Sequence, residues 1–337
     1  MSRVGVVTIG RNEGERLIRC LDSLVAQRSH DMSIVYVDSG STDGSCEAAR
    51  QRGVEVVALD LSIPFTAARA RNAGFDRLLQ IDPTVDYVQF FDGDCEVLPG
   101  WIEAAAAVMD AQPDVVAVCG WRRERYPERS PFNRICDVEW HIGPVGEISC
   151  FGGDVMIRAA TFTAVGGYNP KVIAAEDDEL GVRLRQTGGR LIRIDRHSTV
   201  HDADMHSVRQ WWQRAKRCGY AYAQVSSMHG RLPERKFVKE VRRSLLWGVI
   251  IPLTSLVLAV PTYGWSLLVW GRYPLTAIKT ILNTQKRGFS QADSVPWGIS
   301  CALSAFPEAL GVINFYITRW RKRQHKIIEY KGVNAGG

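Results

Sequence analysis

Two carboxylates, Asp92 and Asp94, stand one residue apart directly after an apolar run over residues 87–91. A strand that stays buried to its last residue and then exposes a close pair of acids is suited to hold a divalent cation. A divalent cation held in this way commonly binds the phosphate groups of a ligand. A surface turn also favours Asp-Gly-Asp, because these residues tolerate left-handed backbone angles. The tripeptide alone therefore leaves both interpretations open, and the surrounding elements decide between them.

Polar residues also follow two earlier strands that the sequence predicts. Residues 4–9 and 33–37 are apolar runs rich in β-branched residues and of strand length. They lead into Asn12 with Glu13 and into Asp38. Because ligands of open α/β sheets bind beyond the carboxyl ends of the strands, we expect these side chains and the acid pair to face a nucleotide. No Gly-x-Gly-x-x-Gly follows the first strand, which disfavours a nicotinamide enzyme.

Strand and helix patterns alternate through the first half of the chain. Residues 54–59 and 115–119 complete the predicted strands, and residues 65–79 have helical spacing. The economical architecture is an α/β fold with a mostly parallel, doubly wound sheet. The pattern breaks down over residues 121–149, where arginines mix with aromatic residues and prolines. We interpret this irregular insertion either as a substrate-binding wall or as a solvated loop.

A second group of acids, Glu176, Asp177, Asp178 and Glu179, opens a segment with helical spacing. The helix dipole favours acids in a first turn, which by itself explains such a cluster. A positioned carboxylate is equally able to act as a general base.

Taken in order, these motifs resemble the family 2 glycosyltransferases, which are inverting enzymes with the GT-A fold. The resemblance runs over about residues 4–219 and implies a catalytic domain over residues 1–230 that uses a nucleotide sugar. Its motifs are Asn12-Glu13, Asp38-Ser39-Gly40-Ser41-Thr42-Asp43, Ala70-Arg71-Asn72, Asp92-Gly93-Asp94, Gly152-Gly153, Gly166-Gly167-Tyr168, and Glu176-Asp177-Asp178-Glu179-Leu180 with Arg183.

The resemblance implies a role for each matched residue on the donor side. Mg²⁺ or Mn²⁺ held by Asp94 neutralises the diphosphate that leaves. Asp92 lies beside the ribose or shares the metal, while Asp38 and Arg71 contact the base. His201 follows a predicted strand at a place where related enzymes carry a further metal ligand, although a plain surface or core histidine fits the sequence equally well.

On the acceptor side, the family pattern assigns the general base to Asp177, with Asp178 as the alternative if the register differs by one residue. One base and no carboxylate nucleophile imply inversion at the anomeric carbon. A glycosidase needs no nucleotide site, so the N-terminal half argues against one. Processive relatives carry Gln-x-x-Arg-Trp near the position of Gln210-Trp211-Trp212-Gln213-Arg214, but the order here differs, which favours transfer of a single sugar.

The C-terminal region, residues 231–337, is predicted to be helical and membrane-associated. Residues 244–271 carry no charge, and basic clusters lie at residues 231–243 and 319–326. Basic residues on both sides favour a re-entrant or interfacial hairpin at the cytoplasmic face of the cell membrane. Burial against the catalytic domain or in a dimer interface is the alternative. Eight scattered cysteines fit a reduced cytoplasmic protein, and a net charge of +6 does not demand a nucleic-acid partner.

These observations predict a metal-dependent inverting glycosyltransferase that moves one sugar, from a UDP-sugar, to a lipid-linked or cell-surface polysaccharide precursor at a membrane surface. Two alternatives remain: a sugar-phosphate nucleotidyltransferase and a non-catalytic membrane scaffold that retains the fold. The former normally has a Gly-rich basic loop after the first strand, which Gly10-Arg11-Asn12-Glu13 does not supply. The donor sugar, the acceptor and the oligomeric state, a homo-oligomer included, are left open by the sequence.

Overall fold

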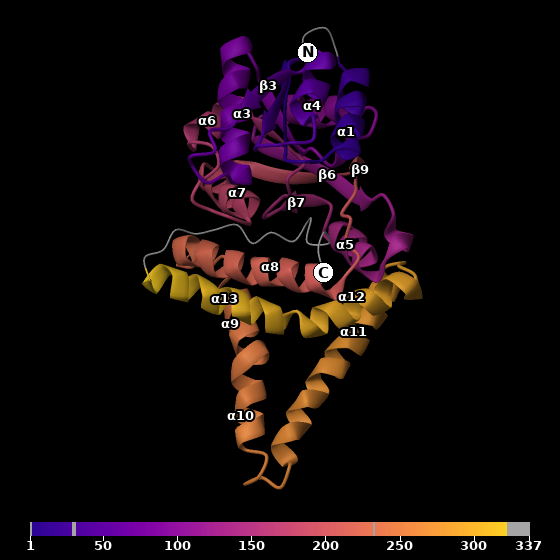
Figure 1. Ribbon diagram of the computed structural model, residues 1–337, viewed down its shortest axis with the longest axis vertical. Helices are drawn as coiled ribbons and strands as arrows, with labels where there is room; N and C mark the ends of the chain where they lie inside the picture. The colour runs from indigo at the N-terminus through magenta and orange to yellow at the C-terminus, as the bar shows by residue number, and fades with distance from the viewer. Residues whose placement is uncertain (1, 29–31, 232, 322–337) are drawn as a thin grey trace. The chain divides into compact units, whose positions relative to one another are not determined.

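The computed structural model describes residues 2–28, 32–231 and 233–321 (Figure 1). The chain forms two compact units. Unit 1 comprises Met1–Arg125 and Trp140–Ala203, and unit 2 comprises Tyr126–Glu139 and Asp204–Gly337. Part of the second basic cluster, residues 322–326, lies outside the described residues.

The compact units divide at Ala203, whereas the sequence analysis placed its boundary after residue 230. The reason is helix α8 (Val208–His229), which packs along α13 (Ala305–Trp320) and so belongs to the helical unit. An amphipathic pattern reveals that a helix has a buried face, but it does not reveal what covers that face. The functional assignment of residues 1–230 and 231–337 stays a prediction.

Unit 1 is built on one nine-stranded mixed sheet. Its first four strands in spatial order are parallel, as the sequence predicted, and β8 then joins antiparallel to both of its neighbours. Strands β6 and β9 are parallel to each other. The order is β3 (Glu55–Ala58), β2 (Ile34–Asp38), β1 (Val4–Gly10), β4 (Tyr87–Asp92), β8 (Val155–Arg158), β6 (Val115–Glu124), β9 (Arg190–His201) and β5 (Cys95–Val97), with β7 (Gly146–Ile148) paired to β9.

Helices cover both faces of this sheet, which confirms the predicted α/β class. Leu17, Leu21 and Leu24 recur at helical spacing and are fully buried in the core of one face. Phe75 and Leu78 do the same on the other face. The first face carries α1 (Glu15–Ala26), α2 (Ser45–Gln51) and α4 (Trp101–Ala111), and the second carries α3 (Ala67–Ile81), α6 (Ala159–Ala164) and α7 (Glu176–Gln186).

The irregular insertion expected over residues 121–149 is absent from the structure, and that prediction was wrong. Strand β6 continues to Glu124, and the 3₁₀ turn Pro127–Arg129, helix α5 (Pro131–His141) and strand β7 follow. Pro127 and Pro131 begin the 3₁₀ turn and α5, where the missing N–H costs nothing because first-turn N–H groups have no helical partner.

Unit 2 is helical throughout its described elements. Helix α8 lies along α13, and a hairpin of α10 and α11 projects from this layer (Figure 1). None of the described helices alone has the length and apolar composition of a membrane span; α12 and α13 meet that test only together, across a 42° bend. The remaining elements are α9 (Val238–Leu245), the π-helical turn η2 (Leu246–Ile250), α10 (Ile251–Val257), the 3₁₀ turn η3 (Trp265–Gly271), α11 (Arg272–Lys286) and α12 (Gln291–Leu303).

Candidate active site

Asp38 ends β2 as a buried, ionised acceptor of hydrogen bonds. Its Oδ2 accepts the backbone N–H groups of Gly40 and Ser41, both at 2.9 Å, and its Oδ1 accepts the Tyr36 hydroxyl at 3.0 Å. Burial acts to raise the pKa of Asp38, but these hydrogen bonds outweigh burial and hold the pKa below its ordinary value. The carboxylate is therefore charged and fixed in orientation.

Asn12 connects the loop after β1 to the loop after β2. Its Oδ1 accepts the N–H of Thr42 at 2.7 Å, and its own N–H donates to Ser41 Oγ at 2.9 Å. The residue adopts φ of +54°, a left-handed conformation that Asn tolerates. Glu13 forms an ion pair with Arg16 at 2.9 Å. The structure thus brings Asn12 beside the Asp38 loop, as the strand ends predicted.

Arg71, on α3, joins the two acidic clusters of the sequence. Its guanidinium donates to Asp92 Oδ1 at 2.8 Å and to Glu176 Oε1 at 2.7 Å, and it lies 3.6 Å from Asp177 Oδ1. The side chain is only 3% exposed. The Arg71 guanidinium is thus occupied by ion pairs with these acids, and its contact with the base of the nucleotide stays a prediction. Asp92 and Asp177 consequently line one site.

Asp177 is the second residue of α7, and its buried Oδ1 accepts no hydrogen bond from the described residues. It lies 3.6 Å from the Arg71 guanidinium, and the Tyr168 hydroxyl is close enough that burial and the charge of Asp177 raise the pKa of Tyr168. Burial, together with the negative charge of Glu176, outweighs the opposing charge of Arg71 and raises the pKa of Asp177 to about 8. A carboxylate of this kind is suited to take a proton from a hydroxyl group that binds beside it.

The other acids of α7 have different surroundings. Glu179 forms an ion pair with Arg183 at 2.6 Å, and Arg183 also donates to the carbonyl oxygens of Val165 and Gly167, both at 2.7 Å. This network ties α7 to the Gly166-Gly167 turn. Asp178 is half-buried, whereas Asp177 lies 3.6 Å from the Arg71 guanidinium and so beside Asp92. The geometry therefore favours Asp177 over Asp178 as the base.

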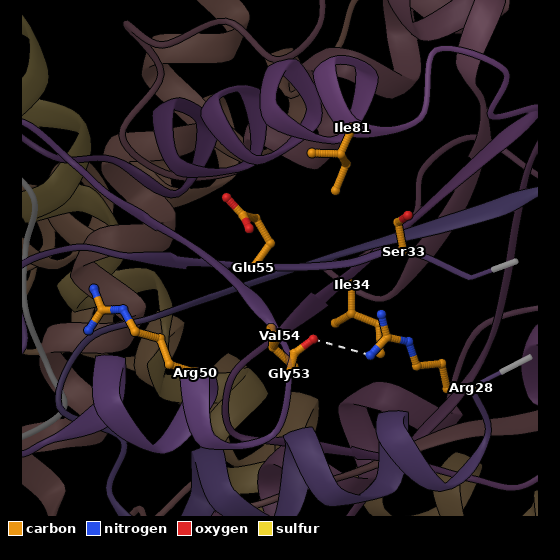
Figure 2. A pocket seen from close by; sticks show the side chains of 8 residues that line it. All are labelled: Arg28, Ser33, Ile34, Arg50, Gly53, Val54, Glu55 and Ile81. Atoms are coloured by element: carbon orange, nitrogen blue, oxygen red, sulfur yellow. Dashed lines mark hydrogen bonds between the residues drawn. The ribbon is translucent and has the colours of Figure 1, made fainter. Parts of the chain in front are cut away.

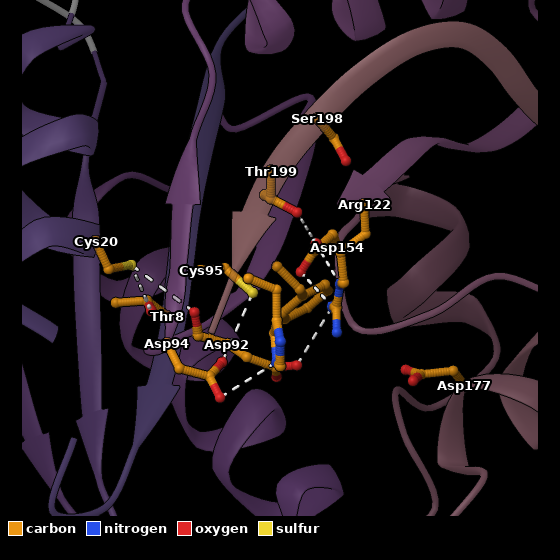
Figure 3. Close-up of polar contacts among 12 residues, drawn as sticks. Thr8, Cys20, Asp92, Asp94, Cys95, Arg122, Asp154, Asp177, Ser198 and Thr199 are labelled. Carbon is orange, nitrogen blue, oxygen red and sulfur yellow. Dashed lines mark hydrogen bonds and ion pairs between the residues drawn. The ribbon is translucent and has the colours of Figure 1, made fainter. Parts of the chain in front are cut away.

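Arg122, whose side chain is 17% exposed, and the buried Asp154 form a second ion pair beside Asp92, which was not predicted from the sequence. Arg122 makes two hydrogen bonds to Asp154, at 2.6 and 2.9 Å, and lies 3.4 Å from Asp92 Oδ2. Thr199 donates to the same Asp154 carboxylate. Figure 3 shows the Asp177 carboxylate directed toward this group from a separate element. Two arginines therefore hold the pKa of Asp92 below its ordinary value although burial acts to raise it.

Asp94 meets His201, the last residue of β9. The imidazole Nε2 lies 3.2 Å from Asp94 Oδ2, and both side chains are buried. Candidate ligand atoms of Asp94, Cys95 and His201 lie within 4.8 Å of one another, as do those of Asp92, Cys95 and Asp154. Carboxylate oxygen with imidazole nitrogen suits Mn²⁺, and carboxylates suit Mg²⁺. The donor set therefore fits the predicted cation.

Two glycines of the sequence motifs let backbone and acids approach closely. A Cβ added at Gly153 would lie 2.7 Å from Asp92 Oδ2 and 2.8 Å from the Arg71 guanidinium. One added at Gly93 would lie 3.0 Å from the carbonyl oxygen of Ile9. A side chain at Gly153 would displace the Asp92 carboxylate, and one at Gly93 would crowd the backbone of β1. The glycines are thus required by space, since neither has a left-handed φ.

A surface hollow of about 380 Å³ lies at the opposite edge of the sheet, near the amino ends of β2 and β3 (Figure 2). The guanidinium of Arg28, on its wall, donates to the carbonyl oxygen of Gly53 at 3.1 Å. None of the acids described above lines it.

The Gln210-Trp211-Trp212-Gln213-Arg214 segment makes structural contacts within unit 2. Gln210 completes a capping box with Ser207 at the start of α8. Trp211 Nε1 donates to Ser300 Oγ at 2.8 Å, and Arg214 makes two hydrogen bonds to Glu139. Gln210, Trp211 and Arg214 therefore have structural roles in the capping and packing of α8.

Comparisons with known proteins agree with this geometry. The model for glycosyl transferase family 2 matches residues 5–165, and that for the N-terminal domain of galactosyltransferase matches residues 144–207. The succinoglycan biosynthesis protein ExoA of Rhizobium meliloti (strain 1021) is 27% identical over 250 residues, which cover 69% of this chain and 73% of ExoA.

Two solved structures share the fold at low sequence identity. The mannosyltransferase PcManGT from Pyrobaculum calidifontis, in complex with GDP-Man and Mn²⁺, has a TM-score of 0.64 at 17% identity, covering 95% of this chain and 88% of its own. The glucosyl-3-phosphoglycerate synthase of Mycobacterium tuberculosis, in complex with Mn²⁺, UDP and glucosyl-3-phosphoglycerate, has a TM-score of 0.50 at 16% identity, covering 67% and 79%. Residues 5–165 therefore carry a glycosyl transferase family 2 domain, and the chain has the GT-A fold.

Proposed function

We propose that the protein is a metal-dependent, inverting glycosyltransferase that moves one sugar from a nucleotide sugar to a lipid-linked or polysaccharide precursor. The observation that carries this proposal is the placement of Arg71 between Asp92 and Asp177, at 2.8 and 3.6 Å. It sets the acid expected beside the donor and the acid expected to act as base in one site. Direct displacement requires both groups around the same sugar carbon.

Asp94 and His201 belong to one group of candidate ligands and Asp92 to a neighbouring group, and these three residues would hold Mn²⁺ or Mg²⁺. When bound, the cation supplies a Lewis acid that neutralises charge on the departing diphosphate. The relatives solved with Mn²⁺ and a nucleotide or nucleotide sugar support this assignment. Arg122 adds a fixed positive charge beside Asp92.

Asp177 accepts the proton of the acceptor hydroxyl. Its pKa of about 8 makes it a stronger base than an ordinary aspartate, and its unfilled acceptor atom is available for that hydroxyl. Since one carboxylate activates the nucleophile and none attacks the sugar itself, the anomeric configuration inverts. Arg71 keeps Asp177 oriented and limits the rise of its pKa.

The donor base is proposed to lie against Asp38, whose fixed carboxylate accepts N–H groups. UDP-sugars are the expected donors. Guanine also presents N–H groups, and PcManGT was solved with GDP-Man, so GDP-sugars are the alternative for the test. The likeness to ExoA, a succinoglycan biosynthesis protein, supports a precursor of a surface polysaccharide as the acceptor.

A donor screen tests the proposal. The full-length protein is incubated with UDP- and GDP-sugars, with Mn²⁺ or with EDTA, and with lipid extracts or oligosaccharide acceptors. Mass spectrometry is expected to detect an acceptor enlarged by one sugar together with free nucleoside diphosphate, and only with the metal. A protein that binds no nucleotide sugar in the presence of Mn²⁺ contradicts the proposal. Formation of a nucleotide sugar from a sugar phosphate and a nucleoside triphosphate identifies a nucleotidyltransferase instead.

A further inference from the structure

The tip of the α10–α11 hairpin exposes large apolar side chains. Val257, Val260 and Tyr263 are 76%, 85% and 94% exposed, and Trp265 and Leu268 are 73% and 67% exposed. They belong to the stretch 244–271, which carries no charged residue. Proteins surrounded only by water rarely expose a continuous apolar surface of this kind.

Polar side chains of the same hairpin direct their donors inward. The Trp270 indole N–H donates to Ser255 Oγ at 2.9 Å, and Ser266 Oγ donates to the Ser255 carbonyl at 2.7 Å. Thr262 Oγ1 donates to the Leu258 carbonyl at 2.6 Å. Hydrocarbon offers no hydrogen bonds, so polar groups within it must be satisfied internally. The hairpin tip meets this requirement at these four residues.

The first charged residue after the uncharged stretch is Arg272, at the start of α11. The Arg272 guanidinium lies 4.0 Å from the centre of a Trp247 ring, and Tyr273 donates to the Trp247 carbonyl. Trp and Tyr favour the boundary between hydrocarbon and headgroups, and Arg favours the headgroups. Helical residues 247–258 rise roughly 18 Å beyond this level at about 1.5 Å per residue. That length crosses one half of a hydrocarbon core about 30 Å thick, not both.

A second apolar surface continues from the base of the hairpin along α12 and α13. Its exposed members recur at spacings of a single helical face. Phe306, near the start of α13, lies on the same helical face. Its ring stacks on Tyr273 with 5.2 Å between ring centroids, which connects this surface to the hairpin. We call it the α12–α13 stripe: Ile299, Leu303, Leu310, Ile317 and Trp320, with exposures between 41% and 80%.

We propose that residues 246–271 insert into one leaflet of an anionic bilayer, with the α12–α13 stripe lying in the headgroup boundary. Residues 239–287 contain seven basic residues and one acid, Glu240, which complements anionic lipid. The basic flanks favour the cytoplasmic leaflet. Attachment does not depend on the transfer reaction, so it stands or fails separately from the proposed function.

Vesicle flotation of the full-length protein tests this attachment. The protein is mixed with phosphatidylcholine vesicles that contain or lack phosphatidylglycerol. We expect it to float, and to float better with the anionic lipid. The triple variant Val257→Asp, Val260→Asp and Leu268→Asp should lose more than about tenfold of its bound fraction, because charge is costly in hydrocarbon. Its thermal midpoint should not change, since all three side chains are exposed.

The matched control is Ile63→Asp, Ile81→Asp and Val145→Asp, three exposed apolar positions of unit 1. It should float like the parent protein. Trp265 then reports the depth: subtracting the fluorescence of Trp265→Phe should reveal stronger quenching by lipids brominated deep in their chains than by lipids brominated near the headgroup. Failure to float overturns the proposal. So does a lipid-free dimer that the hairpin triple variant dissociates, because the hairpin would then contact a second copy.

Discussion

The two units of this protein depart from ordinary burial in opposite directions. Unit 1 buries the guanidinium group of Arg71, and most of the Arg122 side chain, among acids, whereas unit 2 exposes Val260 and Tyr263 almost fully. Folded proteins seldom bury charge without partners, and desolvation opposes even paired charge. Neither departure is explained by stability. The two proposals above account for them, by a charged substrate at unit 1 and by a lipid leaflet at unit 2.

Neutralising the proposed base of unit 1 should have the largest effect on activity. Asp177→Asn should reduce kcat by about 10²–10⁴, the usual contribution of a general base, while donor affinity measured by calorimetry with Mn²⁺ stays near that of the parent. Asp178→Asn, one residue along the same helix, is the matched control and should keep most of the activity. If the two variants exchange these phenotypes, Asp178 is the base.

Removal of the proposed metal ligand should have the next largest effect. Asp94→Asn takes away a buried carboxylate beside His201 and should weaken Mn²⁺-dependent donor binding roughly 10- to 100-fold. Titration calorimetry with and without the metal measures this change. Asp60→Asn, at an exposed turn after β3, controls for loss of an aspartate. Equal donor affinity of Asp94→Asn and the parent protein would remove Asp94 from the metal site.

The pH dependence tests whether the raised pKa of Asp177 is used. A general base must be deprotonated, so kcat/KM should fall about tenfold per pH unit below the pKa of Asp177, which burial raises to about 8 in the free protein. Saturating Mn²⁺ adds positive charge near Asp92 and should move this limb to lower pH. A profile that is flat from pH 6 to 9 at every metal concentration would show that no such carboxylate limits the reaction.

Glu308 is a buried acid of unit 2 that contrasts with the buried acids of the proposed site, and its substitution should have the smallest effect. This buried carboxylate accepts hydrogen bonds from Arg243 at 2.6 Å and Ser244 at 2.7 Å. Because Arg243 is half exposed, Glu308→Gln should lower the free energy of unfolding by only about 1 kcal/mol in chemical denaturation, with donor affinity unchanged. A loss of donor affinity in this variant would contradict the assignment of Glu308 to a purely structural role.

Asp177→Asn should behave oppositely in the same denaturation experiment. A pKa raised to about 8 means that the folded state disfavours the ionised carboxylate, so stability falls as the pH rises from the ordinary aspartate range toward 8. Asn removes that loss. At pH 8 and above, the variant should therefore be at least as stable as the parent protein.

The sequence predicted the acids of the site better than the arginines that hold them. Asp38, Asp92 and Asp94 follow predicted strands, and parallel strands bring their carboxyl ends to one edge. Arg122 and Asp154, in contrast, meet because β6 and β8 are neighbours in space, although 32 residues separate them in the chain. No local pattern encodes that pairing. Arg71 was found through its motif, but its acidic partners depend on how α3 packs.

Unit 2 was harder to predict for a related reason. The uncharged stretch and its basic flanks are visible in the sequence, whereas the packing of α8 on α13 is not. Residues 121–149 were wrongly predicted to be irregular, because local sequence does not distinguish a proline that begins a helix, as Pro127 and Pro131 do, from one in a loop.

The configuration of the product tests the central claim most directly, namely that one aspartate drives direct displacement at the anomeric carbon. Once a donor is identified, proton NMR of the newly formed linkage gives its configuration. A nucleotide sugar with an α linkage should yield a β-linked product, and the reverse for a β-linked donor. Retention of the donor configuration would contradict the account, because it requires a second displacement that Asp177 alone does not provide.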